Sequence, residues 1–442
     1  MAKRFLEQVT KPLATSHSRQ TAPLRPRRTL KPERPAVTEF YIRLSRRLRN
    51  AKLIFAAILV LFSLTVITCS RDRITLENFR YLFRYFDIDA SSGIQGVRHI
   101  SYNADSNLTI AEYRGDIAIG RSNAVTIKSQ SGSTVLDHSN NILTPTLLPS
   151  SKYLLAYDLG GNQYAVYNTF SLLHTETLEN TISTAANSNT GLYAIVTSGK
   201  EYRSVIHLYD SNFHQILRIS KDKLVMDLSF SDDGKHLMIV SVYAKNGSFC
   251  TEVMVVDPYS DTEETTTVLE DTFPLRGQWN QNGGFSLLTD SGLRIYDAAY
   301  RNIAVYAYRK TPASFYTDQS YFVIVSGENV VGSSYLVQIC DTTGKTIFSG
   351  SVDGKIVASR ITESYVYVLT STSLNRINLQ EKQLQSVSTE SGSCVDLLSF
   401  GENLLFLCYP TEAVAVNVDT LFENTAAVSD QENEDALQSK PI

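Results

Sequence analysis

The chain has 442 residues, of which 43% are hydrophobic and 19% are charged. This composition excludes long low-complexity disorder for most of the chain, and the length alone predicts two or three domains of about 150 residues. The net charge of -4 conceals a sharp division: residues 1–52 hold 14 Lys and Arg against three acids, whereas the rest holds 27 bases and 42 acids. Because the basic part is the least foldable part, we expect no nucleic-acid partner.

Residues 1–50 are predicted to form a disordered basic tail on the cytoplasmic side of a membrane. The stretch LRPRRTLKPERPAV combines Pro with positive charge and has no apolar period. The tail has two interpretations, a docking segment for a cytoplasmic partner or a topology signal alone. Arg46, Arg47 and Arg49 directly precede the next segment, where we expect them to attract anionic lipid of the inner leaflet.

An uncharged stretch, LIFAAILVLFSLTVITCS, occupies residues 53–70. Its 18 residues span about 27 Å as a helix, which is just enough to cross the hydrocarbon core of a bilayer. We therefore predict one transmembrane helix over residues 51–70, with the basic N-terminus inside and the remainder outside. A buried core helix, a cleaved signal peptide and a lipoprotein acylated at Cys69 are alternatives. The flanking arginines disfavour a buried core helix, and the long leader disfavours a cleaved signal peptide. Thr68, which stands where a small residue is expected, disfavours the lipoprotein.

Residues 71–96 form a juxtamembrane linker that is rich in aromatic residues. Two interpretations remain open for these rings, because they suit the membrane–water interface and would equally suit packing against the outer domain. The aromatic residues concerned are Phe79, Tyr81, Phe83, Tyr85 and Phe86.

From residue 97 onward the chain repeats with a period near 40 residues. Short apolar runs bounded by Gly, Asn, Asp or Ser are typical of strands and turns. One mark recurs, an apolar run that ends in Asp or Asn before a turn, and Asx side chains suit this place because they hydrogen-bond the backbone two residues on. The mark occurs at Asn168, Asp210, Asp257, Asp297, Asp341, Asn378 and Asp419, with Ser129 taking its place in a first copy.

Each copy has room for four strands, of which the fourth copy is the clearest, with VMDLSF, KHLMIVSV, TEVMVVD and TTTVLE. These runs are apolar on both faces, so each small sheet is expected to be covered on both sides. The pattern predicts an all-β fold, a β-propeller of eight four-stranded blades over residues 97–420, with seven blades as the alternative. The last copy supplies three strands only, and RHISYN (98–103) is left over before the first complete copy. If this orphan strand completes the last blade, the two ends of the domain fasten the ring.

Two sequence features carry a resemblance to known propellers. SFSDDGKHLMIVSV resembles the first-to-second strand pattern of WD-like repeats, and DTTGKTIFSG resembles a turn of quinoprotein-like blades. The whole plan is similar to an uncharacterised family of single-pass, membrane-anchored propellers of Gram-positive bacteria. The resemblance implies an extracytoplasmic propeller and assigns no activity. Quinoprotein blades carry a docking Trp in each repeat, whereas this chain has only Trp279, so we expect no quinone or other cofactor.

The sequence predicts no catalytic residue and no metal site. It has no phosphate-cradling Gly-rich motif, no GxSxG and no HExxH, and an SxxK match at Ser220–Lys223 is assigned to a loop. Cys394 and Cys408 lie on consecutive runs of the last copy, where a short turn would allow a disulfide. A register different by one or two residues would instead leave buried free thiols.

Partner binding is expected at the long loops between the second and third strands of copies three, four and six, which read TSGKEYRS, VYAKNGSFC and SGENVVGSS. Tyr beside Arg or Lys is typical of interaction surfaces, although ordinary exposed loops would look the same. The residues predicted to cluster there are Lys200, Tyr202, Arg203, Tyr243 and Lys245.

The leading functional interpretation is a non-enzymatic scaffold or sensor in the cell envelope that binds another envelope protein. The alternative is a propeller enzyme or ligand binder that acts on a cell-wall glycan or peptide in its central channel, and inward carboxylates converging on the channel would favour it. The last 22 residues, 421–442, are acidic and lack a period, so we expect a flexible tail.

Overall fold

The computed structural model describes residues 50, 52, 54, 55, 98–260, 263–327, 334–389 and 392–423. The chain divides into two units, residues 1–90 and 91–442. Of the first unit, residues 50, 52, 54 and 55 are described and are helical. Among the residues with a described placement, none belongs to a helix with the length and apolar character that crossing a bilayer requires. Apart from residues 52, 54 and 55, the predicted span over 51–70 lies outside the described residues, as do almost all of the basic tail and the whole aromatic linker.

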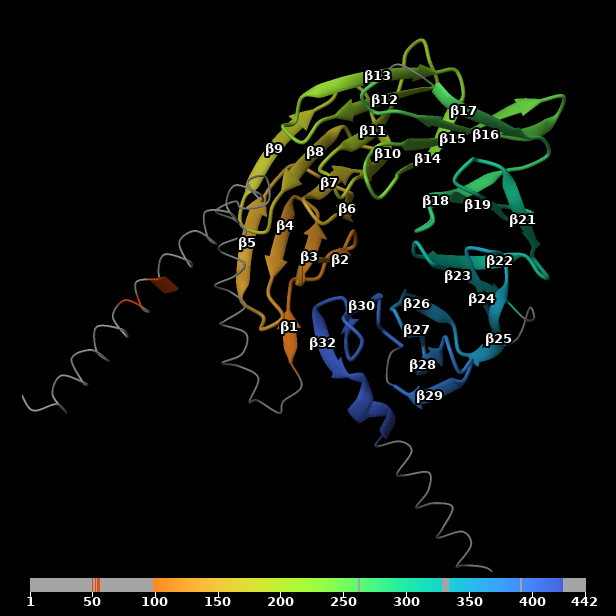
Figure 1. Cartoon of the computed structure of the whole chain (residues 1–442). Coiled ribbons are helices and arrows are strands. Elements are labelled where there is room, and N and C mark those ends of the chain that lie inside the picture. The colour runs from red at the N-terminus through yellow and green to blue at the C-terminus, as the bar shows by residue number, and fades with distance from the viewer. Residues whose placement is uncertain are drawn as a thin grey trace, which may run out of the picture. The chain divides into compact units, whose positions relative to one another are not determined.

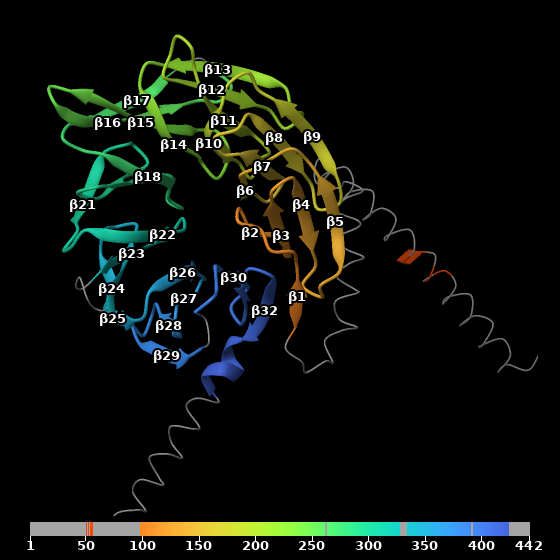
Figure 2. The same cartoon turned by 180° about the vertical axis from the view of Figure 1, so that it is seen from behind.

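The second unit is a ring of eight four-stranded antiparallel sheets, as Figures 1 and 2 show from opposite sides. This confirms the predicted all-β propeller and shows that it has eight blades and not seven. Within each blade the first strand lies innermost and the fourth outermost. The strands of blades 1 to 4, in chain order, are β2 (Thr109–Tyr113), β3 (Asp116–Arg121), β4 (Ala124–Lys128), β5 (Thr134–Ser139), β6 (Pro145–Pro149), β7 (Leu154–Asp158), β8 (Gln163–Tyr167), β9 (Leu172–Thr177), β10 (Ile182–Asn187), β11 (Tyr193–Ser198), β12 (Ser204–Tyr209), β13 (Gln215–Lys221), β14 (Leu224–Phe230), β15 (Leu237–Lys245), β16 (Ser248–Val256) and β17 (Glu263–Leu269).

Blades 5 to 8 follow the same plan, except that the outermost strand of blade 8 comes from the start of the domain. Their strands are β18 (Pro274–Trp279), β19 (Phe285–Thr289), β20 (Gly292–Tyr296), β21 (Asn302–Ala307), β22 (Pro312–Thr317), β23 (Tyr321–Gly327), β24 (Ser334–Asp341), β25 (Thr346–Asp353), β26 (Ile356–Ile361), β27 (Tyr365–Thr370), β28 (Ser373–Asn378), β29 (Leu384–Ser388), β30 (Asp396–Phe400), β31 (Leu404–Cys408), β32 (Glu412–Asn417) and β1 (His99–Ser101).

The ring closes through strand β1, as the orphan strand of the sequence predicts. His99 lies opposite Val414 and Ser101 lies opposite Glu412 in an antiparallel pair of β1 with β32. The side-chain hydroxyl of Tyr102 also donates to the backbone carbonyl of Tyr409 at 2.6 Å. Two segments more than 300 residues apart therefore complete one blade.

In blades 2 to 7 the recurring Asx residues cap the turn between the third and fourth strands, as predicted. The prediction is wrong for Asp419, which lies in a short helix after β32 because the fourth strand of blade 8 comes from the start of the domain. Oδ1 of Asp341 accepts from the backbone N–H of Thr343 at 2.9 Å and of Lys345 at 3.0 Å. Asp297 accepts in the same way from Ala299 and Arg301. Because these bonds satisfy N–H groups that the sheet leaves unpaired, the short side chain fixes the turn locally.

Apolar clusters fill all eight junctions between consecutive blades. The middle strands are buried on both faces, as in β7, where all five residues are buried. Burying one Leu, Ile or Phe side chain is worth roughly 2 kcal/mol relative to leaving it exposed. The contacts between neighbouring blades, and not the isolated sheets, therefore supply most of the apolar stabilisation.

The domain continues past β32 into a short helix at residues 418–423. Val418 and Phe422 are buried in the junction between blades 7 and 8, and the guanidinium of Arg376 lies 4.3 Å from the centre of the Phe422 ring. The first three residues of the predicted acidic tail are thus part of the folded domain, and residues 424–442 lie outside the described part.

Candidate functional site

Two rims of the ring differ in their loops because the strands of each blade run antiparallel. One rim carries the turns between second and third strands together with the connections from one blade to the next, and we call it the connection rim. The opposite rim carries the other two sets of turns. The predicted partner-binding loops lie on the connection rim, at residues 199–203 of blade 3 and at the Asn246–Gly247 turn of blade 4. The third predicted loop, residues 328–333, lies outside the described residues.

In blade 3 the predicted residues border a hollow of about 200 Å³ on the connection rim. Lys200 and Tyr202 line it together with Glu179 and Arg218. The Tyr202 side chain is 42% exposed, which leaves much of its ring open to solvent. Arg203 is exposed directly beside it.

In blade 4 the predicted residues have partners of their own. The Lys223 ammonium lies 4.5 Å from the centre of the Tyr243 ring, and Lys245 pairs with Glu270 at 2.8 Å. In the described part of the chain no contact joins these residues to those of blade 3. The structure therefore places the five predicted residues on one rim but in two separate groups.

Exposed apolar side chains gather on the connection rim, a feature that the sequence analysis missed. The described propeller has 13 large apolar side chains that are exposed, of which Tyr259 lies on a turn of the opposite rim. Five lie on outer strands: Ile216, Ile303 and Leu384 near the end that meets the opposite rim, Val305 in mid-strand, and Val268 near the end that meets the connection rim. The seven on the connection rim are Leu143, Leu159, Tyr202, Leu224, Phe249, Leu275 and Val395.

Phe249 is the centre of this surface in blade 4. It is 56% exposed and makes an edge-to-face contact with Phe273, with ring centres 5.3 Å apart. Phe273 comes from the connection between blades 4 and 5, and the backbone N–H of Thr272 donates to the carbonyl of Phe249 at 3.0 Å. Phe249 lies in the run VYAKNGSFC, the same predicted loop as Tyr243 and Lys245. The sequence could therefore have indicated it as a residue of the binding surface.

The inner strands of blades 3 to 7 each have a β-bulge near their first residue, at the end that meets the connection rim. The inner strands of blades 1, 2 and 8 pair without one. A bulge inserts an extra residue and changes the direction of the side chains beside it. The extra residues are Ser183, Met226, Leu275, Ala313 and Val357.

The central channel contains two hollows, of about 370 and 330 Å³, between the inner strands. Arg276 on β18 lines both of them, and within the described residues its guanidinium donates no hydrogen bond. Asp227 on β14 accepts from the backbone N–H groups of Leu228 and Gly277 at 3.0 and 2.9 Å. Asp396 on β30 accepts from Arg360 at 2.8 Å.

These inward carboxylates do not form a pair. Burial raises the pKa of Asp227, against the opposing effect of its N–H donors and of Arg276. Burial likewise raises the pKa of Asp396, against the opposing effect of Arg360. The two residues belong to blades 4 and 8, and among the described residues neither contacts the other. A third carboxylate, that of Asp318, lines the smaller hollow and accepts from the backbone N–H groups of Ser320 and Tyr321.

Cys394 and Cys408 are free and buried in the structure. Cys408 lies opposite Asp396 in the sheet, not opposite Cys394, and the two thiols belong to the apolar clusters on different sides of blade 8. The predicted alternative of buried free thiols is therefore the state observed, because the register puts the two sulfurs on opposite faces. Within the described ranges no three His, Cys, Asp or Glu side chains gather in a way that would hold a metal ion.

The fold and its closure define this protein as an eight-bladed β-propeller. Residues 92–413 match a family of unknown function, DUF5711, and the chain belongs to that family. No curated protein matches the chain.

Solved structures resemble the propeller in fold alone. BamB from Moraxella catarrhalis is 12% identical, covers 72% of this chain and 99% of its own, and has a TM-score of 0.50. The WD40 domain of Neurospora crassa Pan2 is 10% identical, covers 62% of this chain and 90% of its own, and has a TM-score of 0.43.

Proposed function

We propose that this protein is a membrane-anchored scaffold whose propeller lies outside the cytoplasm and binds another envelope protein through the connection rim. The observation that carries the proposal is the distribution of exposed apolar side chains on the loops, with Leu143, Leu159, Tyr202 and Val395 on this rim and Tyr259 alone on the turns of the other. Exposed aromatic and aliphatic residues beside Lys and Arg are typical of binding surfaces. In blade 3, Lys200 and Arg203 flank Tyr202 in one exposed loop.

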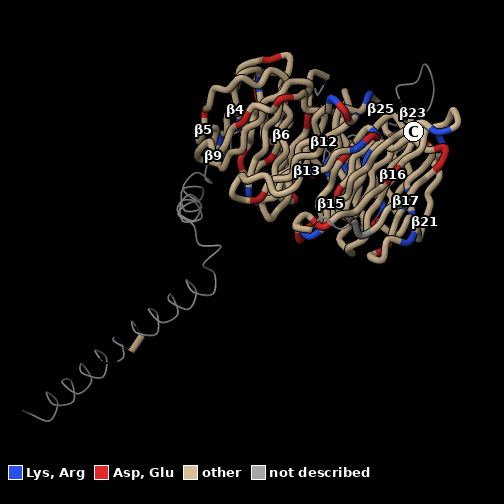
Figure 3. The backbone as a smooth tube through the Cα atoms, turned by 90° about the horizontal axis from the view of Figure 1, so that it is seen from above, with Lys and Arg blue, Asp and Glu red and all other residues tan. Residues whose placement is uncertain are grey.

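Charge supports a protein partner over nucleic acid. Figure 3 shows Lys and Arg interspersed with Asp and Glu along the described propeller. The ion pair of Lys245 with Glu270 further reduces the free positive charge of the rim. A nucleic-acid surface would instead gather positive charge on one face.

The anchor and orientation are proposed from the sequence. The uncharged residues 53–70 and the excess of Lys and Arg before them support one span with the N-terminus inside. The same basic residues are proposed to contact anionic lipid. Protease added outside intact cells freed of their wall should remove a C-terminal epitope tag and spare an N-terminal one, and the reverse pattern would contradict this topology.

The scaffold is tested by crosslinking in intact cells, followed by capture of the full-length protein and quantification of the protein crosslinked to it. Phe249→Asp and the triple change Lys200→Glu, Arg203→Glu and Lys245→Glu should each lower recovery of the partner about tenfold, as expected for loss of a main contact. Leu384→Asp at the start of β29 in blade 7, near the opposite rim, is the matched control and should leave recovery unchanged. Loss of the partner with Leu384→Asp but not with the rim variants would contradict the proposed surface.

The alternative, an enzyme or ligand binder that acts on a wall glycan or peptide in the channel, has less support. Asp227 and Asp396 lie on separate blades with separate partners. Screening wall fragments against the full-length protein remains the direct test of this alternative.

A further inference from the structure

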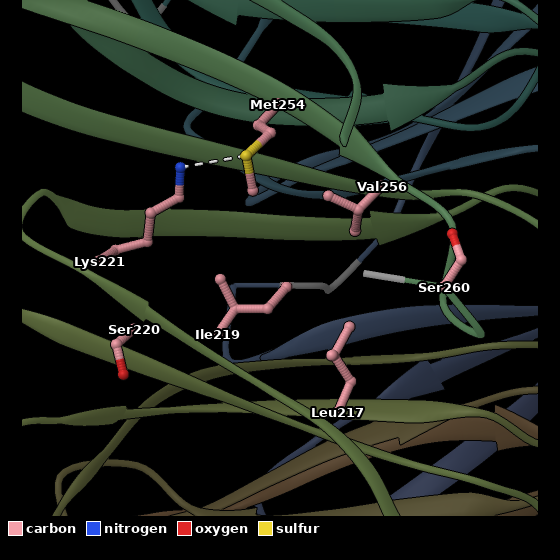
Figure 4. Close-up of a pocket in the computed structure, with 7 residues that line it drawn as sticks. All are labelled: Leu217, Ile219, Ser220, Lys221, Met254, Val256 and Ser260. Carbon is pink, nitrogen blue, oxygen red and sulfur yellow. Dashed lines mark hydrogen bonds between the residues drawn. The ribbon is translucent and has the colours of Figure 1, made fainter. Parts of the chain in front are cut away.

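The junction between blades 3 and 4 contains a cavity of about 220 Å³ on its outer side (Figure 4). It lies between β13, the outermost strand of blade 3, and β16, the third strand of blade 4. Alternate residues of a strand point to the same side of a sheet, so each strand contributes one row of side chains. The two facing rows are Leu217, Ile219 and Lys221 on β13, and Glu252, Met254 and Val256 on β16.

The neighbouring junction shows why this one is hollow. In blade 2, His174 pairs with the next-to-last residue of the third strand, as Leu217 does in blade 3. Phe213 follows the end of β12 by four residues, as Ser260 follows the end of β16. Between blades 2 and 3 the His174 and Phe213 rings stack, with centres 5.2 Å apart and planes 2° from parallel. Leu217 and Ser260 occupy the corresponding places between blades 3 and 4, so the space of a ring is left open.

The end of the cavity nearer the connection rim holds two lysines around one carboxylate. Lys221 Nζ donates to Glu252 Oε1 at 2.9 Å and to the thioether sulfur of Met254 at 3.2 Å. Lys223 donates to the other oxygen of Glu252. Burial, the largest single influence, would raise the pKa of Glu252, but the two lysines together hold it below its ordinary value. One ionised carboxylate is therefore shared by two ammonium groups.

Of the two acceptors of the Lys221 ammonium, the Met254 sulfur could be replaced by a stronger one. An ammonium group carries three N–H donors, and a thioether sulfur is a weak acceptor. A second carboxylate at the mouth of the cavity would replace Met254 as a partner of Lys221 and form a charge-assisted hydrogen bond with it. The apolar side chains that line the cavity suit an aromatic ring, and the Lys221 ammonium at one end of the cavity suits a carboxylate close to that ring.

We propose that this cavity receives an aromatic side chain of the protein partner together with a neighbouring carboxylate of the same peptide. The ring takes the place that Phe213 fills in the adjacent junction, and the carboxylate pairs with Lys221. This inference rests on the proposed scaffold function and adds a second, chemically defined contact to it. It lies on the outer wall of the ring, apart from the apolar residues of the connection rim.

The pocket is tested with small probes on the full-length protein by isothermal titration calorimetry. The probes are 3-phenylpropionate and its neutral counterpart 3-phenylpropan-1-ol. The carboxylate should bind more tightly, and Lys221→Gln should remove about tenfold of its affinity while leaving the alcohol unchanged. Ser260→Phe should abolish binding of both probes because it supplies the missing ring. Equal binding of acid and alcohol, or undiminished binding by a folded Ser260→Phe variant, would overturn the proposal.

Controls separate this inference from the scaffold proposal. If Ser260→Phe does not fold, Leu217→Phe fills the same cavity from the other row. Phe249→Asp should leave probe binding unchanged. Failure of the crosslinking experiment alone would therefore refute the scaffold proposal, whereas binding of the aryl carboxylate to the cavity would stand. Ser260→Phe should also lower recovery of the crosslinked partner. Probe binding without that effect would mean that the cavity takes a free aryl carboxylate and not a peptide, which contradicts the proposal.

Discussion

The junctions on the two sides of blade 3 share one strand plan and differ in what lies between the strands. Between blades 2 and 3, Tyr193 stacks on Tyr209 with ring centres 4.8 Å apart, and the Tyr164 hydroxyl donates to Glu176 at 2.6 Å. Between blades 3 and 4, aliphatic side chains line a cavity that ends at Lys221 and Glu252. The comparison teaches that strand register determines which positions face each other across a junction, whereas side-chain size decides whether the space between them is filled.

The two junctions also treat charge differently. Burial raises the pKa of Tyr164 and of Tyr193, so these phenols are neutral at any ordinary pH. Glu252 instead stays ionised, since Lys221 and Lys223 together outweigh its burial. Both junctions have an apolar cluster, to which the first adds neutral rings and the second adds an ionic cluster.

The largest effect is expected from Glu252→Gln. It leaves Lys221 and Lys223 facing each other without their shared carboxylate, and breaking a buried ion pair from one side costs about 3 kcal/mol. Urea denaturation measures this loss in the free energy of unfolding. Glu270→Gln is the control in the same blade, because its partner Lys245 is 52% exposed and an exposed ion pair contributes little to stability. Equal losses in the two variants would remove the distinction between the ionic junction and the surface.

A reciprocal exchange comes next in size. Phe213→Ser opens the junction between blades 2 and 3 and should cost about 2 kcal/mol, less than for a fully buried ring because Phe213 is only partly buried. Ser260→Phe fills the other junction and should change stability by less than about 1 kcal/mol in either direction. Thermal or urea unfolding of both variants measures the pair. A larger loss from Ser260→Phe than from Phe213→Ser would show that the two sites are not equivalent.

The smallest effect is the dependence of the ionic junction on pH. The folded-state pKa of Glu252 lies below its unfolded value of about 4.5, so its stabilisation is fully present above that pH. It is lost as the pH falls through the folded-state pKa. The difference in urea midpoint between the native chain and Glu252→Gln should therefore shrink stepwise from pH 5 to pH 3. A difference that stays constant or grows over this range would contradict an ionised Glu252.

The sequence predicted the parts of the fold that have local causes. Asp297 and Asp341 mark their turns because an Asx side chain bonds the backbone only two and four residues on. The orphan strand at residues 98–103 was identified because one blade lacked a fourth strand and the chain had one to spare. Blade number followed from the same count of marks.

The contacts between blades could not be predicted in the same way. Lys221 and Glu252 lie 31 residues apart on different sheets, and no spacing rule joins them. The SxxK match at Ser220–Lys223 was assigned to a loop, but Ser220 lies in β13 and lines the cavity together with Lys221. The alternation of Leu217, Ile219 and Lys221 was visible, but the row that faces it depends on the register of the next blade.

Closure by β1 gives the molecule a mechanical asymmetry. The described domain begins and ends in blade 8, where β1 contributes only three residue pairs to β32. Tension applied through the two ends of the domain would load those pairs before any other blade. During synthesis the same strand emerges first and must wait for the last strand before it has a partner. Blade 8 is therefore the last to be completed and the first to open under load.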